Sequence, residues 1–502
     1  MKNLISISKI IIRNIKSKDI LALLFVFITT LSTAQQAEKE NKIAPEKLIQ
    51  DFQLLRASLE EGYPAMYRYS SKITIDSLFN ASEKQLQKQM SEQEFYVFLS
   101  KVVMQIRDGH MDVYPTENTR NKLDNCECSV PFKAYISGQK MYVQKNYSNL
   151  SDEVILGAEI ISINGQPVSA FISDVLKITS SDGNNETNKY KRLESTGLLT
   201  RYLFYLQGYT ENYKIEYVPM NNKVTKTATL KGIRFENLLQ ILKNKYPEVA
   251  QFPAEFKLLN DSSAYLKIKS FNRDEFVNSE INFNDFLEST FQTINNKGVK
   301  NLIINLRGNL GGTDKYGKML FSYFVDHEFM YYESLIINKP KFNFMKYTDD
   351  PELEIPEEAI KKNDVGTYNV IDHPNVGIQE NSTPYYSGKL YVLIDGDCFS
   401  TTSEFLSMLH SYTAAVFIGE ESGGGYNGNC SGSVPLVTLP NSLLQIGIPL
   451  MKYSMAVKEY KYKDRGVIPD YNILPTIKDK ILSRDPELEF ALQLIKWLTS
   501  YK

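Results

Sequence analysis

From residue 263 onward the sequence alternates between short apolar runs and longer amphipathic stretches, and this alternation constrains the fold more than any other feature. The apolar runs have the length of buried strands, and the stretches between them carry apolar residues at helical spacing. The predicted strands span 264–268, 301–306, 389–394 and 416–419, and the predicted helices span 283–296 and 316–324. Such an alternation indicates an α/β layer with parallel strands. The polar stretch 340–387 interrupts it and is expected to be a surface insertion.

The run after the third predicted strand combines a turn with a helix start. Asp395-Gly396-Asp397 is a turn signal, and Thr401-Thr-Ser-Glu404 has the form of a capping box with Thr401 as its N-cap. Ser400 then lies just outside a helix N-terminus, where backbone N–H groups and the helix dipole stabilise an anion. A serine at such a place can act as a nucleophile. The alternative is a serine that merely precedes a helix cap.

Two glycine-rich runs follow two other predicted strands. Residues 307–312 read Arg-Gly-Asn-Leu-Gly-Gly, and residues 419–425 read Gly-Glu-Glu-Ser-Gly-Gly-Gly. Glycine lets the backbone N–H groups of a loop approach a ligand closely. Because loops after the carboxyl ends of parallel strands converge on one edge of the sheet, we expect both runs to lie near Ser400. Each run alone would indicate no more than a tight turn.

In this order the runs resemble peptidase family S41, the carboxyl-terminal processing and tail-specific proteases that include the tricorn core. The matching residues are 305–312, 399–405, 419–425 and 466–470. The resemblance implies an α/β core of the ClpP/crotonase-like kind and an exported serine endopeptidase that works through an acyl-enzyme. It implies a peptide or protein substrate, with recognition of a free C-terminus as one option, and it implies no cofactor and no metal.

The resemblance also implies roles for individual residues. Ser400 would be the nucleophile, and its oxyanion hole would consist of the N–H of Thr401 and that of Gly311 or Gly312. Processing proteases of the family supply a general-base lysine from a Gly-Lys-Gly run after the serine. The corresponding position here is Gly425, which excludes a Ser–Lys dyad of that kind.

His110 is the general base that the resemblance implies instead. The tricorn-like branch uses a histidine from the end of the N-terminal helical region, and Asp108-Gly109-His110 matches that pattern. An imidazole suits this role because its ordinary pKa lies near neutrality, so it can take a proton from a serine and return it to a leaving amine. Asp108 would fix the loop that carries His110.

The acid that would orient His110 is expected shortly before the run 466–470. Asp464 is the nearest acidic residue, and Glu459 is the alternative. The other interpretation is that both are solvated charges in a polar stretch.

The remaining serine and histidine candidates have simpler explanations. Ser422 lies in Glu421-Ser-Gly-Gly424, which is similar to the Asp-Ser-Gly-Gly run of chymotrypsin-like proteases, but those are all-β and this region is α/β. His410 follows Ser400 on the same predicted helix and is expected to be structural. His327 and His373 lie on polar connecting stretches and are expected to be solvated.

Ahead of the α/β core the pattern changes twice. Residues 44–126 carry apolar stripes at helical spacing and are predicted to be an N-terminal helical region. Residues 127–233 contain short alternating β segments, and residues 157–168 resemble the Gly-x-x-Ile-x-x-Ile-Asn-Gly-x-Pro run of PDZ domains, which bind peptide ends by strand addition. Residues 179–189 are predicted to be a mobile polar loop. The core then spans 234–502 and starts with a helical connector over 234–259.

The first 34 residues have the features of a secretory signal peptide. A basic segment is followed by the apolar run 20–31 and by Ser32-Thr-Ala34, so cleavage is expected after Ala34 and a periplasmic or secreted protein results. An uncleaved anchor is the alternative. Since no cysteine lies near the cleavage site, a lipoprotein is not expected, and no stable membrane span is expected after cleavage.

The net charge bears on nucleic-acid binding, and the four cysteines bear on possible disulfides. The 502 residues carry a net charge of −2, which gives no support for nucleic-acid binding. Cys126-Glu-Cys128 is expected to be too tight for a mutual bridge, whereas Cys398 and Cys430 could pair. Two functions other than a peptidase stay open: a peptidase-like scaffold that binds peptides or small ligands without turnover, and an esterase-type serine hydrolase.

Overall fold

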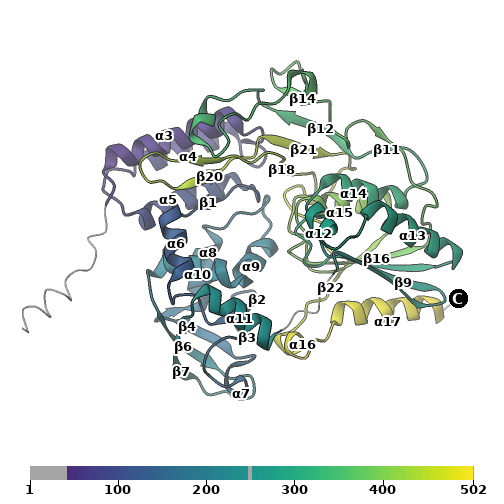
Figure 1. Cartoon of the computed structure of the whole chain (residues 1–502), viewed down its shortest axis with the longest axis horizontal. Coiled ribbons are helices and arrows are strands. Elements are labelled where there is room, and N and C mark those ends of the chain that lie inside the picture. Colours follow the sequence, from purple (N-terminus) through teal and green to yellow (C-terminus); the bar gives the residue numbers. More distant parts are fainter. Residues whose placement is uncertain (1–41, 247–251, 501–502) are drawn as a thin grey trace, which may run out of the picture.

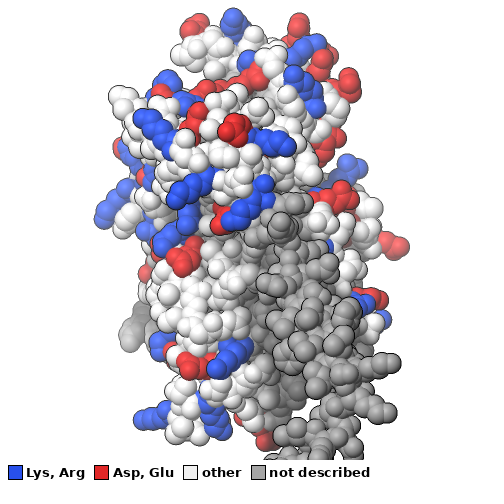
Figure 2. All heavy atoms as spheres, turned by 90° about the vertical axis from the view of Figure 1, so that its left-hand side faces the viewer, with Lys and Arg blue, Asp and Glu red and all other residues white. Residues whose placement is uncertain are grey.

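The computed structural model describes residues 42–246 and 252–500 (Figure 1). The predicted signal peptide over 1–34 lies outside the described residues. Within the described ranges, no helix combines the length and the apolar character that a membrane crossing requires. On the face shown in Figure 2, Lys and Arg side chains lie among Asp and Glu side chains and form no single basic patch.

A six-stranded sheet forms the centre of the core. Its strand order is β22-β17-β16-β10-β9-β8, and every pair from β9 to β22 is parallel, whereas β8 runs antiparallel to β9. The predicted α/β layer with parallel strands is therefore confirmed. The strands are β8 (Ala254–Asn260), β9 (Ser263–Ile268), β10 (Asn301–Asn305), β16 (Lys389–Ile394), β17 (Val416–Gly419) and β22 (Tyr471–Asn472).

Helices cover both faces of this sheet because its strands are apolar on both sides. Leu302 and Ile304 of β10 pack against one helical layer, and Ile303 between them points to the opposite face and packs with Ala491 of α17. The first layer consists of α12 (Arg273–Asn278), α13 (Phe283–Asn296), α14 (Asp314–Phe321) and α15 (Thr401–Tyr412), and the second face is covered by α17 (Pro486–Ser500).

The N-terminal helices share a hydrophobic core with segments from the other end of the chain. Val113 of β1 (Val113–Tyr114) pairs with Ile446 of β20 (Gln445–Gly447), and both side chains are fully buried. This pairing fixes the loop between the helices and β1 against the C-terminal third of the chain. The helices of this core are α3 (Pro45–Gly62), α4 (Lys72–Glu83) and α5 (Glu92–Val103). Helix α6 (Glu117–Asn125) follows β1, and β19 (Leu436–Thr438) completes the sheet.

In the sequence, a separate β domain lies between the N-terminal helices and the α/β core. Its backbone ends meet where Ser129 and Ile233 exchange two hydrogen bonds. Asn164 and Gly165, both at positive φ, form the predicted turn after its third strand. The sheet order is β2-β3-β4-β6-β7, with β2 (Phe132–Ser137), β3 (Lys140–Asn146), β4 (Glu159–Ile163), β6 (Asn212–Val218) and β7 (Lys226–Lys231), and β5 (Gln166–Pro167) pairs with β4. Its helices are α7 (Asp152–Ile155), α8 (Val168–Leu176), α9 (Thr187–Glu194) and α10 (Thr196–Gln207).

Two sequence predictions in this part of the fold need correction. Residues 179–186 form a largely buried connection, since Thr179, Asp182 and Asn185 are almost completely inaccessible, and residues 187–189 belong to helix α9. The predicted helical connector 234–259 forms α11 (Phe235–Lys245) but ends in strand β8. The stretch 340–387 lies mostly at the surface outside the central sheet, as predicted, and it adds β13 (Ile360–Lys362) and β14 (Tyr368–Val370) to a sheet with β12 (Tyr332–Ile337), β21 (Met451–Met455) and β18 (Cys430–Ser431).

The prediction that Cys126 and Cys128 are too close for a mutual bridge was also wrong. Cys126 and Cys128 form a disulfide, because the extended backbone after α6 leaves their Cα atoms 5.2 Å apart, within the range that a disulfide spans. Cys398 and Cys430 are free and buried.

Candidate active site

Ser400 occupies the turn between β16 and α15 in a backbone conformation that is rare for a residue with a side chain. Its φ is 53° and its ψ is −130°, and strain of this kind is concentrated at functional sites. Ser400 is itself the N-cap, and α15 begins at Thr401. The predicted capping box is therefore wrong, and the Glu404 carboxylate instead accepts hydrogen bonds from Tyr332 (2.7 Å) and Asn429 (2.8 Å).

His110 lies directly over Ser400. The distance between His110 Nε2 and Ser400 Oγ is 3.2 Å, within reach of a hydrogen bond, although 290 positions separate the two residues. The Phe399 ring packs against the imidazole with the ring centroids 4.5 Å apart. A Cβ on Gly109 would come within 2.7 Å of the Phe399 ring, so the glycine permits this close packing. The structure thus brings together the two residues that the sequence predicted as nucleophile and base.

The glycine-rich loop after β10 lies beneath the serine. A Cβ on Gly311 would come within 2.8 Å of Ser400 Cβ and 3.0 Å of the Thr401 nitrogen, and the φ of Gly311 is 99°. The Gly311 N–H donates to Asn309 Oδ1 (2.9 Å), so it is already engaged. Among the described residues the N–H groups of Gly312 and Thr401 have no acceptor. Of the two glycines, Gly312 is therefore the better candidate for an oxyanion donor beside Thr401.

Two buried aspartates surround the other side of His110. Asp108 Oδ1 accepts from the His110 amide (2.8 Å), and Asp108 Oδ2 accepts from the Tyr63 hydroxyl (2.6 Å). Asp182, from the segment between α8 and α9, accepts from the Gly109 amide through Oδ1 (2.8 Å). One atom from each of Asp108, His110 and Asp182 lies within 4.8 Å of the others. Sequence reasoning missed Asp182, because nothing in its polar surroundings set it apart from a solvated loop residue.

Burial dominates the electrostatics of this group. Desolvation lowers the pKa of His110 to about 4; the Asp182 carboxylate opposes this shift, and the Arg192 guanidinium adds to it. Burial and the neighbouring Asp182 charge raise the pKa of Asp108 to about 7. His110 is therefore a neutral imidazole at pH 7, the form that can accept the serine proton.

The cluster of Asp108, His110 and Asp182 is the one group of described residues close enough to hold a metal ion. However, the carboxylate oxygens of both aspartates already accept hydrogen bonds from amides or from Tyr63. These bonds would have to break for a metal to bind, so we interpret the cluster as the surroundings of His110.

The residues predicted to orient His110 lie elsewhere. The Asp464 carboxylate is 42 % exposed and faces Arg107 (3.9 Å) and Asn184 (3.5 Å). The alternative, Glu459, is 84 % exposed and pairs with Lys463. In the described part of the chain neither makes a hydrogen bond to His110, so the structure does not bring Asp464 to the catalytic pair as the sequence predicted.

The competing serine and histidines have structural contacts. Ser422 is fully buried, and its Oγ accepts from the Val467 amide (2.8 Å). His410 Nδ1 lies 2.9 Å from the Tyr426 hydroxyl, and His327 is exposed, as predicted. His373 is not solvated, since it is half-buried and its Nε2 lies 3.0 Å from Asp314.

A cavity of about 420 Å³ contains both Ser400 and His110 in its wall. Leu310, Phe399 and Val434 give it an apolar side. Asp314 and Glu404 give it an acidic side, where burial and the Asp314 charge raise the pKa of Glu404 to about 7. The volume lies within the range of pockets that bind small ligands.

Serine-type hydrolases combine a serine at a helix N-terminus with an imidazole in contact with it and free amides beside it, and Ser400, His110 and the amides of Gly312 and Thr401 have this arrangement. Residues 262–473 match the model of peptidase family S41. Through this segment the chain belongs to peptidase family S41 and is a serine-type peptidase.

Solved structures share the fold over nearly the whole chain. Mature CPAF is 14 % identical, with 90 % of this chain and 96 % of that chain covered and a TM-score of 0.59. Mature CPAF complexed with lactacystin is 13 % identical, with 91 % and 98 % covered and a TM-score of 0.60. A serine-to-alanine mutant of CPAF is 13 % identical, with 90 % and 96 % covered and a TM-score of 0.62. No curated protein matches the sequence.

Proposed function

We propose that this protein is an exported endopeptidase that cleaves peptide bonds through an acyl-enzyme on Ser400, with His110 as the general base. The observation that carries the proposal is the 3.2 Å approach of His110 Nε2 to Ser400 Oγ at the wall of a cavity. Gly425 supports the choice of histidine, because a Cβ there would come within 2.9 Å of the Gly428 carbonyl and 3.2 Å of the Tyr69 hydroxyl, which leaves little room for a lysine.

In the first half of the reaction Ser400 Oγ attacks the carbonyl carbon of the scissile bond and His110 Nε2 takes its proton. The N–H groups of Thr401 and Gly312 donate to the oxyanion that forms. The C–N bond then breaks, and His110 gives its proton to the leaving amine nitrogen. In the second half a water molecule gives a proton to His110 and attacks the ester, and the proton returns to Ser400 as the carboxylate product leaves.

The β domain, residues 129–233, supports the proposal that the substrate is a peptide chain. Its sheet ends in the edge strands β2 and β7, and we propose that it is PDZ-like and can add a peptide strand, including one that ends in a free carboxylate. The ClpP/crotonase-like character of the core and export by the predicted signal peptide are parts of the same proposal.

A fluorophosphonate probe tests the nucleophile. Wild type and Ser400→Ala are compared with Ser422→Ala as the matched control, since both variants remove one hydroxyl near the same glycine-rich loop. We expect label on wild type and on folded Ser422→Ala and none on Ser400→Ala. Labelling that survives Ser400→Ala would overturn the assignment.

Peptide and ester substrates separate the peptidase from an esterase-type enzyme and from a scaffold without turnover. We expect casein digestion that stops on Ser400→Ala. A folded enzyme that hydrolyses simple esters but leaves casein and peptides intact would contradict the endopeptidase. Lactacystin, which is bound to mature CPAF in a solved structure, serves as a competitor of the probe.

A further inference from the structure

The segment 179–188 of the β domain is anchored between the parts of the chain that carry the catalytic residues. Asn188 Nδ2 donates to the Gly396 carbonyl (2.9 Å) in the turn before Ser400. Thr187 Oγ1 donates to the Glu421 carbonyl (3.0 Å), and Asn185 Nδ2 donates to the Ser422 carbonyl (2.6 Å) in the glycine-rich loop after β17. The Gly183 amide donates to the Arg107 carbonyl (3.0 Å) on the His110 loop.

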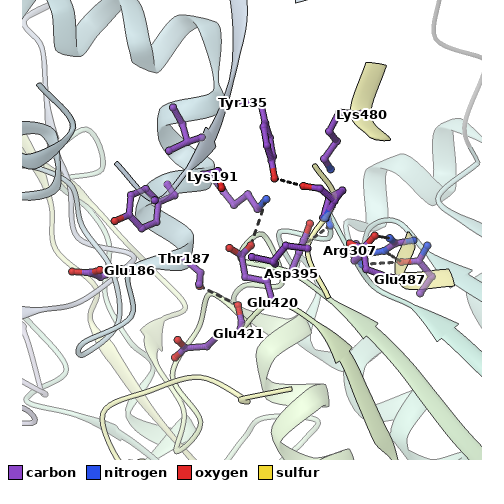
Figure 3. Close-up of a pocket in the computed structure, with 18 of the residues that line it drawn as sticks. Tyr135, Glu186, Thr187, Lys191, Arg307, Asp395, Glu420, Glu421, Lys480 and Glu487 are labelled. Atoms are coloured by element: carbon purple, nitrogen blue, oxygen red, sulfur yellow. Dashed lines mark hydrogen bonds and ion pairs between the residues drawn. The ribbon is translucent and has the colours of Figure 1, made fainter. Parts of the chain in front are cut away.

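Side chains of the β domain and of the α/β core also meet around a neighbouring cavity of about 530 Å³, shown in Figure 3. Lys191 of α9 reaches across to Glu420 (3.4 Å), and Tyr135 of β2 donates to the Pro475 carbonyl. Arg307 pairs with Glu487 (3.0 Å) on the core side of this cavity. The β domain is thereby held against the core by contacts that do not involve His110.

Asp182 has a different role from the other members of this segment, because its carboxylate bridges two catalytic loops. Oδ1 accepts from the amide of Gly109, the residue before His110, at 2.8 Å, and Oδ2 accepts from the amide of Gly425 at 3.0 Å. The side chain is 1 % exposed, so both bonds are shielded from water. One carboxylate thus fixes the position of the His110 loop relative to the loop beside Ser400.

His110 also needs a negative charge on the side away from Ser400. If Nε2 accepts the serine proton, the neutral ring carries its own proton on Nδ1, and His110 Nδ1 is buried without a hydrogen-bond partner among the described residues. The charged or titratable groups around the ring are Asp182, Asp108, which is hydrogen-bonded to Tyr63 just after α3, and Arg192 of α9. Of these, the two aspartates are the groups that can stabilise an imidazolium.

We infer that Asp182 is the positioning residue of the catalytic pair: it holds the His110 loop against the Gly425 loop and supplies the negative charge that the imidazolium faces during the reaction. This assignment rests on the proposed function. It replaces Asp464 in that role and assigns one carboxylate of the β domain to the positioning of His110.

The test compares Asp182→Asn with Thr187→Val, which removes a hydroxyl that contacts Glu421 and Asn185 and makes no hydrogen bond to the His110 loop. Fluorophosphonate labelling rates are measured from pH 3.5 to 8, with thermal melting to follow the fold. We expect Thr187→Val to label as wild type. We expect Asp182→Asn to label at least about tenfold more slowly, with the acid limb of its rate profile at lower pH, because a neighbouring negative charge stabilises the protonated ring. In peptide assays the loss should appear in kcat with KM unchanged.

A folded Asp182→Asn with the wild-type rate and acid limb would overturn the inference. If that variant does not fold, Asp182→Glu decides, since it keeps the charge and must keep the wild-type acid limb. A folded Asp182→Glu whose acid limb moves to lower pH would also overturn it. Ser400→Ala and His110→Ala are measured in parallel: if either labels as wild type, it is the proposed function that fails, whatever Asp182→Asn does.

Discussion

Burial lowers the pKa of His110 and the nearby Asp182 carboxylate raises it, and burial is the stronger of these two effects. Its pKa is lowered to about 4, from an ordinary value of 6.5. A base must be neutral to act, so protonation on the acid side removes activity only near this lowered value.

We therefore predict that kcat/KM for a peptide substrate is nearly constant from pH 7 to pH 5 and falls to half near pH 4. The measurement is a pH–rate profile, with circular dichroism at each pH to exclude unfolding. A half-point near pH 6.5, as for an exposed imidazole, would show that His110 is not desolvated or is not the base.

Glu404 is buried four residues after the proposed nucleophile. Burial and the Asp314 charge raise its pKa from 4.5 to about 7, against the opposing hydrogen bonds from Asn429 and Tyr332. A carboxyl group with a raised pKa in the folded state favours folding in its protonated form. This contribution is complete below pH 4.5 and is lost as the pH rises through 7.

We predict that Glu404→Gln, which stays neutral, gains stability relative to wild type by about 2 kcal/mol between pH 5 and pH 8. Urea unfolding at the two pH values measures this change. If the difference in the free energy of unfolding between wild type and Glu404→Gln does not vary with pH, the pKa of Glu404 is not raised.

Among the elements of the core, the loop 307–312 contains two glycines whose substitution would have different physical consequences. Gly308 (φ 78°) and Gly311 (φ 99°) both adopt backbone conformations that favour glycine. A Cβ on Gly308 would meet nothing within 4 Å, whereas one on Gly311 would come within 2.7 Å of the Phe399 carbonyl and 2.8 Å of Ser400.

We predict that Gly308→Ala costs about 1 kcal/mol of stability and leaves activity nearly unchanged, since only backbone strain is added. Gly311→Ala should lower the fluorophosphonate labelling rate by about tenfold or more, because the added methyl group displaces Ser400. Equal labelling rates in the two folded variants would show that the close approach beneath the serine is unimportant.

The elements of the core could be predicted closely from the sequence, and two features of the site could not. The runs 283–296 and 389–394 coincide with α13 and β16, because apolar periodicity reports burial directly. The capping box failed because Glu404 has buried partners in Tyr332 and Asn429 that lie far away in the chain. The segment 179–189 was predicted to be mobile because its composition is polar. In the structure its polar side chains bond to backbone groups far away in the chain, which local composition does not reveal.

At the scale of the whole molecule, the proposed site depends on contacts between distant parts of the chain. The loop of His110 is held by β1, and β1 pairs with β20, so a C-terminal strand supports an N-terminal loop. Ile446 is fully buried at this junction. The family resemblance was enough to predict His110 as the base. Which of Asp182 and Asp464 lies beside His110 could be decided only from the folded structure.

We predict that Ile446→Ala lowers the free energy of unfolding by about 2–5 kcal/mol, through lost burial and the cavity that remains. Val365→Ala is the control, because Val365 is 83 % exposed and should change the same quantity by less than about 0.5 kcal/mol. Chemical denaturation measures both. A loss below about 1 kcal/mol for Ile446→Ala would mean that the junction of β1 and β20 does not support the fold.

If His110 activates Ser400 across the assembled chain, the rate of fluorophosphonate labelling at Ser400 must depend on the imidazole. His110→Ala is compared with His410→Ala, which removes a structural histidine from α15, the helix that begins directly after Ser400. Mass spectrometry should place the label on Ser400 in wild type and in His410→Ala, and the rate in His110→Ala should fall by about a hundredfold or more. A folded His110→Ala that labels Ser400 at the wild-type rate would contradict the account.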